Sequence, residues 1–315
     1  MKVLNVTTIN CRGQTRFNVS KQLQVQDFIV NHRIDIALLQ ETNFNTETFD
    51  KCDNIKNNFS YVYNNSNNEF GTAVIVRNTF EINNIKIDTE GRIITCEVGG
   101  ITFANVYAPS GSDGDSRSHR EGIFGDSLPN ILINRKDNGI IGGDWNSIIL
   151  KSDCTKNPEA KISPCFRRLA SVLELCDSHR SVHPRSNDFS RYYVNDRFGS
   201  GATRIDRLYS YGNINPIKSS YIPIPWSDHY AQVVSYTLPD IISKKLSPRS
   251  KPIYKISPNV IDDELFQEQL KEAVLHWSEL RDYHHYSLLQ WWDLLVKPGI
   301  RKLAINRSRE INKSR

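Results

Sequence analysis

The sequence lacks an apolar run long enough to cross a membrane, because no segment approaches the roughly 18 consecutive apolar residues that a spanning helix needs. Its first ten residues, MKVLNVTTIN, are interrupted by polar residues and do not predict a secretory signal peptide. The six cysteines include no C-x-x-C pair, which predicts reduced thiols and gives no indication of a zinc site. What remains is typical of a globular protein with a sizeable core and no membrane partner.

Net positive charge is absent outside the C-terminal end. Residues 301–315 contain six basic side chains and one acidic one, and their net charge of +5 equals that of the whole chain. The other 300 residues therefore sum to zero. Any attraction of the main domain to nucleic acid must come from a local groove, and the tail predicts a basic helix or arm. A simply solvated end is the alternative that the composition leaves open.

Strand-like and helical patterns alternate over the first 238 residues. Several of the strand-like stretches are continuous apolar runs, which is typical of strands buried on both faces. One helical pattern begins near Ser20, and another begins at Ser163-Pro164, where a capping residue precedes a proline. The second pattern places Leu169, Val172 and Cys176 on one apolar face. The strand-like stretches are 3–10, 35–42, 72–77, 92–98, 101–109, 139–145, 203–210 and 231–237.

The composition changes after residue 238. Residues 247–258 are basic and punctuated by prolines, which predicts a linker. Apolar residues then recur at helical spacing from Phe266 to Trp277 and again from Leu288 to Leu295. We therefore divide the chain into a layered α/β domain at 1–238, a linker at 239–258 and a region of one to three helices at 259–315.

The stretch GGDWNS, residues 142–147, brings polar residues to the end of an apolar strand. Asp144 and Asn146 are two residues apart, so in an extended segment they share one face. Trp145 points the other way and is expected in the core. Gly142 and Gly143 are expected to let the backbone approach a ligand closely.

Polar side chains also follow the other apolar strands, and functional groups of layered α/β proteins gather there. Each residue alone has an ordinary interpretation: Asn10 as a turn residue, Glu41 as a helix cap, and Asp228-His229 as a surface pair. Asp206 is different, because an acid inside a buried strand needs a partner. The set as a whole is far more specific, and it comprises Asn10, Glu41, Tyr107, Asp144, Asn146, Asp206, Asp228 and His229.

In this order the motifs resemble the endonuclease/exonuclease/phosphatase superfamily, and within it the apurinic-endonuclease-like nuclease domain of non-LTR (LINE-type) retrotransposons. The resemblance implies a four-layer α/β sandwich, with two packed sheets flanked by helices, and a helical C-terminal extension. That extension, 259–315, resembles the connector that precedes the reverse transcriptase; no polymerase domain follows, so the chain resembles a fragment or a truncated copy. The matching motifs are NCRG (10–13), LLQET (38–42), NVYAPSG (105–111), GGDWN (142–146), TRIDRLY (203–209) and SDH (227–229).

The resemblance implies a magnesium-dependent reaction, with manganese as the alternative ion. Mg²⁺ prefers few carboxylates and keeps several waters, and it neutralises charge on a phosphate. Glu41 is expected to be the main ligand. Asn10 is expected near the metal, and Asp228 is expected either in the metal shell or as a residue that tunes His229.

The remaining polar residues receive catalytic roles from the resemblance. Asp144 is expected to activate the attacking water, with Asn146 holding that water or the phosphate. His229, oriented by Asp206, is expected to stabilise negative charge on the phosphate. Tyr107 is expected to donate its hydroxyl to a phosphate oxygen.

Residues 191–202 predict a hairpin beside this site. Aromatic and β-branched residues can begin a strand there, and the glycines of Gly199-Ser200-Gly201 can turn the chain back. Arg191 and Arg197 on the hairpin are expected to contact DNA. Arg12 and Ser190 are expected to do the same, although Ser190 stands where the family often has threonine. The alternative is a surface hairpin whose arginines form ordinary ion pairs.

Together the motifs imply an endonuclease that nicks double-stranded DNA and leaves a 3′-hydroxyl for target-primed reverse transcription. Such a substrate places the protein in the nucleus, and the element's own RNA is a further partner through downstream domains absent from this sequence. The alternatives are an apurinic endonuclease or exonuclease of DNA repair, a phosphatase of the same fold, and an inactive, domesticated DNA-binding domain. The intact polar set argues against the last of these.

Overall fold

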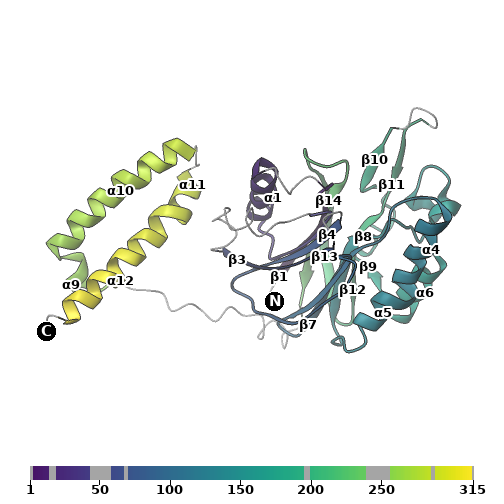
Figure 1. The fold of residues 1–315 in the computed structure, drawn as a ribbon, viewed down its shortest axis with the longest axis horizontal. Coiled ribbons are helices and arrows are strands. Elements are labelled where there is room, and N and C mark those ends of the chain that lie inside the picture. Colours follow the sequence, from purple (N-terminus) through teal and green to yellow (C-terminus); the bar gives the residue numbers. More distant parts are fainter. Residues whose placement is uncertain are drawn as a thin grey trace. The chain divides into compact units, whose positions relative to one another are not determined.

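Two six-stranded β-sheets pack against each other in the body formed by residues 1–247 of this computed structural model (Figure 1). In spatial order, the first sheet contains β13 (Asn215–Pro223), β14 (Tyr230–Thr237), β1 (Val3–Asn10), β2 (Ile36–Gln40), β4 (Phe70–Arg77) and β3 (Phe59–Ser66). The second contains β5 (Ile82–Ile87), β6 (Ile93–Val98), β7 (Ile101–Tyr107), β8 (Gly139–Asp144), β12 (Asp206–Tyr211) and β9 (Cys176–Asp177).

Each sheet has one parallel pair near its centre, β1–β2 in the first sheet and β7–β8 in the second. Parallel neighbours end at the same edge of a sheet, so residues that follow β1 and β2, or β7 and β8, come close together. The other pairings within the two sheets are antiparallel. This arrangement is what assembles the polar strand ends described below.

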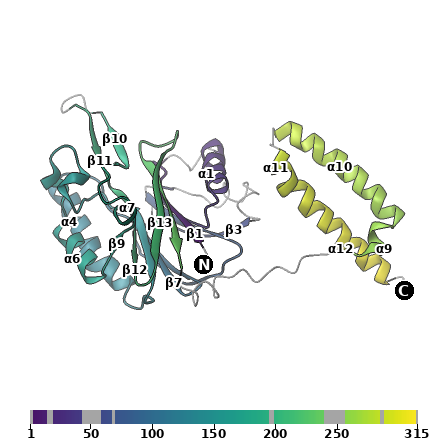
Figure 2. The ribbon, with the colours of Figure 1, turned by 180° about the vertical axis from the view of Figure 1, so that it is seen from behind.

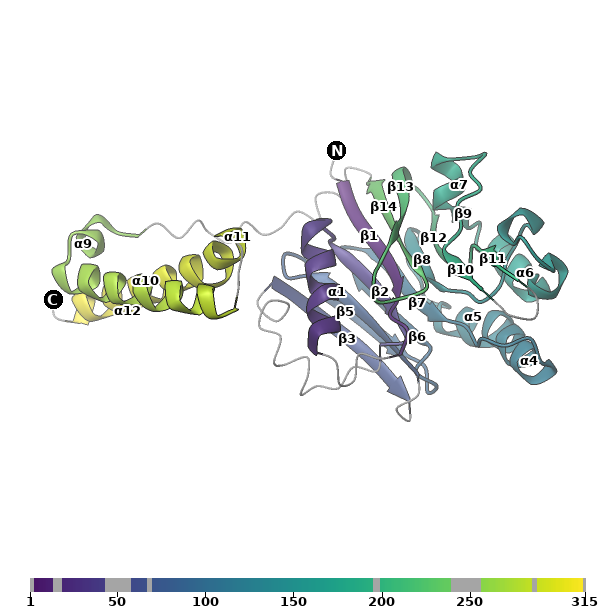
Figure 3. The same ribbon diagram turned by 90° about the horizontal axis from the view of Figure 1, so that it is seen from above.

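Helices cover the outer faces of both sheets and complete the predicted four-layer α/β sandwich. Figures 1 and 3 show α1 on one side of the sheets and α4, α5 and α6 on the other. The helices of this body are α1 (Val19–Asn31), α4 (Gly114–Gly122), the π-helical turn η1 (Ile123–Ser127), α5 (Leu128–Ile131), α6 (Pro164–Val172) and α7 (Ser178–Val182).

The end of α6 differs from the sequence-based prediction. It begins as expected, with the Ser163 hydroxyl accepting from the Phe166 amide at 3.0 Å and Pro164 in the first turn. It ends earlier, because Glu174 adopts a left-handed φ of 51° and the Leu175 amide donates back to the Ala170 carbonyl. Val172 is consequently exposed, and Cys176 lies exposed on β9 instead of on a buried helix face.

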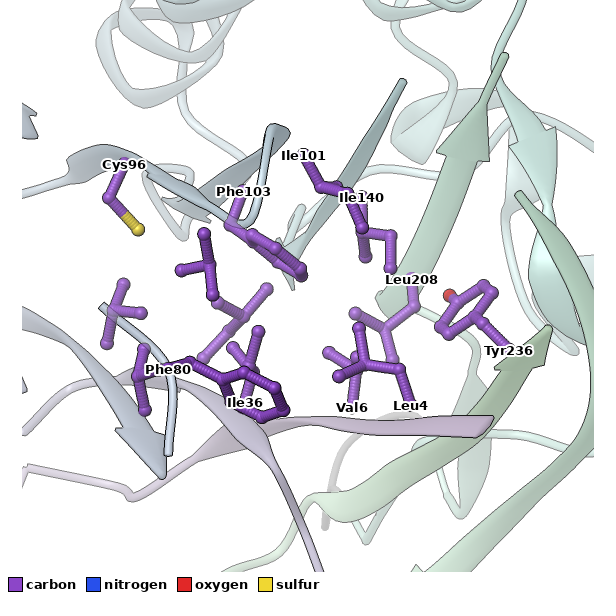
Figure 4. Packing of buried hydrophobic residues seen from close by; sticks show 14 of the residues in the cluster. Leu4, Val6, Ile36, Phe80, Cys96, Ile101, Phe103, Ile140, Leu208 and Tyr236 are labelled. Carbon is purple, nitrogen blue, oxygen red and sulfur yellow. The ribbon is translucent and has the colours of Figure 1, made fainter. Parts of the chain in front are cut away.

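The main core lies between the two sheets (Figure 4). Leu4, Val6 and Ile36 of the first sheet face Phe103 and Ile140 of the second, and all five are fully buried. Two further clusters lie under α1 and under the helices α4 to α6. Three apolar layers therefore separate the four layers of secondary structure.

Residues 248–315 form a second, helical body. Its small core is built on Val260, Phe266 and Ala304, and Arg307 pairs with Asp263 through two hydrogen bonds of 2.7 and 2.9 Å. The basic tail is part of a helix that runs from Lys297 to Lys313. The elements are α9 (Pro258–Ile261), α10 (Glu264–His284), α11 (Leu288–Trp291), the π-helical turn η4 (Trp292–Val296) and α12 (Lys297–Lys313).

The structure describes residues 3–13, 19–42, 58–66, 70–194, 199–238, 256–284 and 288–313. Arg197 and most of the predicted linker lie outside these ranges. Among the described helices, none is both long enough and apolar enough to span a bilayer.

The packing between the sheets predicts a strong effect of core truncation. Phe103→Ala removes a fully buried ring from this interface and should lower the free energy of unfolding by about 3–5 kcal/mol. Ile87→Ala, at a half-exposed position on β5, should change it by about 0.5 kcal/mol or less. Urea denaturation followed by the β-sheet circular dichroism signal measures both. Equal effects of the two substitutions would contradict this account of the core.

Candidate active site

Three polar side chains stand in one row across the second sheet. β7 pairs with β8 so that Tyr107 lies opposite Asp144, and β12 pairs with β8 so that Asp206 lies opposite the same residue. All three are almost completely buried. The strand register therefore places two carboxylates and a phenol side by side at the end of β8.

Asn10 joins this row to the first sheet. It ends β1 opposite Gln40, the last residue of β2, and Glu41 follows directly. The Asn10 side-chain amide donates to Glu41 Oε1 and to Asp144 Oδ2, both at 2.9 Å. The Tyr107 hydroxyl also donates to Glu41 Oε1, at 3.0 Å. Side chains from both sheets thus form one hydrogen-bonded cluster.

His229 and Asp206 form a buried pair within this cluster. His229 Nδ1 lies 2.9 and 2.8 Å from the two carboxylate oxygens of Asp206, and both side chains are nearly inaccessible to solvent. The predicted partner of the acid in TRIDRLY is therefore His229. Because the carboxylate engages Nδ1, Nε2 is the ring atom left to meet a substrate.

Burial and mutual charge shift the pKa values of this group. Burial lowers the pKa of His229, but the Asp206 carboxylate more than offsets it and raises the pKa to about 9. Burial, together with the neighbouring Asp206, raises the pKa of Asp144 to about 7. Asp144, Asp206 and His229 each offer one side-chain oxygen or nitrogen that could bind a metal ion, and these three atoms lie within 4.8 Å of one another. The site therefore carries a protonated histidine beside an acid that titrates near neutral pH.

Asn146 meets Asp144 as predicted, but through a turn. β8 ends at Asp144, and Asn146 has a left-handed φ of 43°, so the two do not share a face of an extended strand. The Asn146 amide donates to Asp144 Oδ1 at 3.0 Å, and its side chain donates to the Ala108 carbonyl at 2.9 Å. Arg12 and Glu41 are left-handed too, and non-glycine residues held this way are often found at functional sites.

The two glycines of GGDWN are required by the packing of the sheets. A Cβ on Gly142 would collide with Leu208, which packs between the sheets, and one on Gly143 would collide with the Val106 carbonyl. Gly143 also has a φ of +151°. Trp145 lies in the core as predicted, stacked on Phe166.

Ser190 differs from the prediction of a DNA contact. It is fully buried, and its hydroxyl accepts from the backbone amides of Ile205 and Asp206, both at 2.9 Å. A hydroxyl that holds two amides beneath the surface cannot reach a nucleic acid. Its position instead fixes the start of β12 and with it the Asp206 carboxylate.

Asp228 lies between two arginines. Arg191 Nε donates to it at 3.0 Å, and Arg12 Nε approaches it at 3.5 Å. Burial raises the pKa of Asp228, but His229 and the two arginines outweigh this and leave it lowered. Its charge is thus neutralised by arginines, and not held ready for the metal shell as expected.

The predicted hairpin is present. β10 (Arg191–Tyr193) pairs in antiparallel fashion with β11 (Gly201–Thr203), and Arg191 bridges to His229. Figure 2 shows the two strands beyond the ends of the large sheets. The hairpin therefore stands next to the buried pair.

Glu41 offers a carboxylate oxygen to a metal ion, in addition to the nearby group of Asp144, Asp206 and His229 whose atoms could also hold one. Glu41 Oε1 accepts two hydrogen bonds, whereas Oε2 accepts none within the part of the chain that the structure describes. Asn10 offers its amide hydrogens to the carboxylates, and its oxygen accepts from the Arg12 amide at 2.8 Å. Asn10 therefore turns its NH2 group, and not its oxygen, toward Glu41, whereas a metal ion would need the oxygen. One carboxylate oxygen supplemented by water suits Mg²⁺.

Sequence reasoning missed the residues that support the cluster. Gln40 and Asn105, both fully buried, join the two sheets by a 2.6 Å hydrogen bond directly behind Glu41 and Tyr107. The Ser227 hydroxyl donates to the Asn10 carbonyl and accepts from the His229 amide. All three belong to the quoted motifs LLQET, NVYAPSG and SDH, so the signal was present without an assigned role.

Comparison with known proteins gives one family and a group of related folds. Residues 7–229 match the model of the Endonuclease/Exonuclease/phosphatase family. A search of curated proteins gave no significant match. Similar solved structures include a 3′-5′ exonuclease from Neisseria meningitidis, with 20% identity, coverage of 73% of this chain and 98% of that chain, and a TM-score of 0.58.

Two AP endonucleases have a similar fold. The enzyme from Archaeoglobus fulgidus is 19% identical over 73% of this chain and 98% of its own, with a TM-score of 0.57. The enzyme from Leishmania major is 18% identical over 76% of this chain and 89% of its own, with a TM-score of 0.59. At these identities the likeness concerns the fold alone. The family model, however, spans more than half of the sequence, and the chain therefore belongs to the endonuclease/exonuclease/phosphatase family.

Proposed function

We propose that this chain is a metal-dependent endonuclease that hydrolyses phosphodiester bonds of double-stranded DNA. The observation that carries the proposal is the buried Asp206–His229 pair beside Asp144, tied through Asn10 to Glu41. Phosphodiester hydrolysis needs a base for water, positive charge at the phosphate and stabilisation of the leaving oxygen. The cluster contains a group suited to each task.

Asp144 is the proposed general base. Its pKa of about 7 lets it hold or release a proton near neutral pH, where a base of this kind is most effective. Asn146 and Asn10 hold its two oxygens through hydrogen bonds and leave it fixed in one orientation. Asp144 takes a proton from a water molecule as the water oxygen forms a bond to phosphorus.

His229 is the proposed contact of the phosphate, whereas Tyr107 donates its single O–H to Glu41 Oε1 and so holds that carboxylate. The imidazolium of His229 presents Nε2 while Asp206 holds Nδ1, so positive charge is aimed at the oxygens that become more negative. Tyr107 remains protonated, because burial and Glu41 raise the pKa of its hydroxyl. The bond from phosphorus to the 3′ oxygen breaks, and that oxygen takes a proton from solvent, giving a 3′-hydroxyl and a 5′-phosphate.

Glu41 is the proposed holder of the ion. A bound Mg²⁺, or Mn²⁺ as the alternative, supplies positive charge to the scissile phosphate. Asn10 and Tyr107 hold Glu41 Oε1 and leave Oε2 to the ion. We retain Asn10 as the residue that positions Glu41, and Asp228 as the residue that positions Arg12 and Arg191.

The retroelement assignment is the finer part of the proposal. It is supported by the forms NVYAPSG and TRIDRLY and by the helical body that follows the nuclease body. In this setting the nicked strand ends in the 3′-hydroxyl that primes reverse transcription in the nucleus, and the element's RNA arrives with other domains. The division at 1–238, 239–258 and 259–315 is then nuclease, linker and connector.

A repair enzyme is the second candidate. It is favoured by the similar structures of AP endonucleases from two organisms and of a 3′ phosphatase from Neisseria bound to a product DNA hairpin. The two candidates differ in substrate: a repair enzyme needs an abasic site or a strand end, whereas the proposed enzyme cuts intact duplex.

The first prediction separates these candidates. The chain should nick supercoiled plasmid in Mg²⁺ and leave ends that a DNA polymerase extends, and Glu41→Ala should lower the nicking rate about 10³-fold or more. Glu81→Ala, at an exposed carboxylate outside the cluster, serves as the control and should leave the rate unchanged. Cleavage of an abasic oligonucleotide without nicking of intact plasmid would favour the repair enzyme. DNA binding without any cleavage would favour the inactive domain.

The second prediction concerns the buried pair. Residues that act as one unit show non-additive losses, so Asp206→Asn, His229→Ala and the double variant should have similar residual nicking rates. Asp188→Asn removes the carboxylate from another histidine pair, His179–Asp188, and should leave the rate near that of the wild type. Single losses that multiply in the double variant would show that the two residues act independently.

The third prediction follows from the pKa of His229. Its protonated form is present below about pH 9, so activity should fall as the pH rises through that value. In Asp206→Asn, the carboxylate that raises the pKa is gone while the burial that lowers it remains, so the fall should move to lower pH. The pH–rate profile and an NMR titration of the metal-free protein measure this shift. An unmoved titration would refute the assigned cause.

A further inference from the structure

A segment that carries no assigned role lies against the β10–β11 hairpin. It contains the 3₁₀ turns η2 (Lys151–Asp153) and η3 (Pro158–Lys161). The Thr155 amide donates to the Ala202 carbonyl at 3.0 Å, the Ala202 amide donates to Thr155 Oγ1 at 2.9 Å, and Cys154 bridges to Thr203. Residues 151–161 therefore flank β11 on the side away from β10, and we call them the flanking segment.

The end of the flanking segment returns to the catalytic strand. The Ile148 amide, just after GGDWNS, donates to the Lys161 carbonyl at 2.9 Å, and Ile148 also bridges to Ile162. Lys161 Nζ lies 5.7 Å from the ring centre of Tyr193 on β10. The lysine is thus held between the hairpin and the turn that positions Asn146.

The charge of Lys161 is poorly compensated. Burial is the main cause that lowers its pKa, while Asp144 acts on it favourably and Arg191 and Arg120 act on it unfavourably. Within the described ranges, no carboxylate lies within ion-pair distance of its ammonium. A half-buried cation without an acidic partner is costly, and a bound anion would remove that cost.

Neighbouring arginines differ in this respect. Arg204 and Arg180 are neutralised by Asp153 and Asp177, with contacts of 2.6 to 2.9 Å. The charges of these two arginines are therefore neutralised by ion pairs within the protein. Lys161 has no such partner, although Asp144 stands near enough to influence its pKa.

We propose that Lys161 binds a phosphate of the DNA strand, adjacent to the scissile one, as that strand passes over the surface that the hairpin and the flanking segment form together. The proposal rests on the proposed function, because it takes DNA as the ligand. The ammonium lies over the ring of Tyr193, and Asp144 is close enough for its charge to act on the lysine, so Lys161 stands beside the catalytic cluster without belonging to it. Its contribution is to affinity and register along the strand.

Salt dependence of binding tests this role. Each phosphate neutralised by a cation adds about 0.9 to the slope of log affinity against log salt, so Lys161→Met should lower that slope by about one. Affinity for a labelled, intact duplex, measured by fluorescence anisotropy in EDTA between about 50 and 200 mM KCl, gives the slope without cleavage. Lys161→Arg keeps the charge and should keep the slope. Lys218→Met, at an exposed lysine on β13, is the matched control and should also keep it.

Kinetics provide a second readout. Lys161→Met should raise KM for plasmid nicking about 5- to 10-fold and leave kcat within about twofold, because a contact to a non-reacting phosphate acts equally on the ground and transition states. Circular dichroism checks that the variant is folded.

The outcomes separate this inference from the nuclease proposal. If folded Lys161→Met shows the same slope of log affinity against log salt as the wild type, the role of the lysine is overturned. The nuclease proposal is unaffected by that result. A lowered slope in a protein that never cuts DNA supports the lysine and overturns the nuclease. A wild-type protein that does not bind the duplex overturns both.

Discussion

The buried pair of Asp206 and His229 is the interaction on which the active site depends. Asp206 belongs to β12 of the second sheet, whereas His229 directly precedes β14 of the first, so their hydrogen bonds join the two sheets at one edge. Neither charge is stable there alone, since an unpaired buried ion costs several kcal/mol. The pair in turn sets the field felt by Asp144, whose pKa rises through burial and the neighbouring carboxylate. One structural contact thereby helps to produce both the positive charge and the base that the proposed chemistry needs.

The rest of the site follows from keeping two sheets in register at this edge. Asn10 connects Glu41 of one sheet to Asp144 of the other, and Gln40 and Asn105 repeat the connection one layer deeper. Behind them the apolar interface of Leu4, Phe103 and Ile140 sets the spacing. Polar groups buried between two sheets are favourable only when their hydrogen bonds are made. Here the hydrogen bonds of Asn10, Gln40 and Asn105 join the sheets, and the apolar interface behind them keeps the sheets at the right distance. Catalytic geometry and core packing are therefore not separable here.

The sequence pattern predicted the secondary-structure elements better than it predicted which groups each side chain contacts. Apolar runs located the central strands of both sheets, whereas the edge strands β3, β13, β5 and β9 were not predicted. The polar residues at the ends of the central strands include the whole cluster, because a strand end is a property of local sequence. The partner of each side chain depends on register and on turns that no local pattern encodes. Asn146 reaches Asp144 through a left-handed turn, and Ser190 is used by backbone amides. The glycines of GGDWN are required by Leu208 and Val106, which lie far away in the sequence.

The distribution of charge shows how a nuclease body with little net charge could still bind a polyanion. The first 300 residues carry no net charge, so attraction cannot come from the field of the whole body. Several of its arginines form ion pairs with carboxylates. Arg204 and Arg180 do so in the interior, and Arg12 and Arg191 do so with Asp228. The Asp228 pairs are partly exposed, so an incoming phosphate can compete for those guanidinium groups at little cost. The interior pairs are buried and cannot be exchanged in this way. Affinity for a backbone thus depends on a few cations at the edge where the strands end, and binding there brings the backbone to the catalytic cluster.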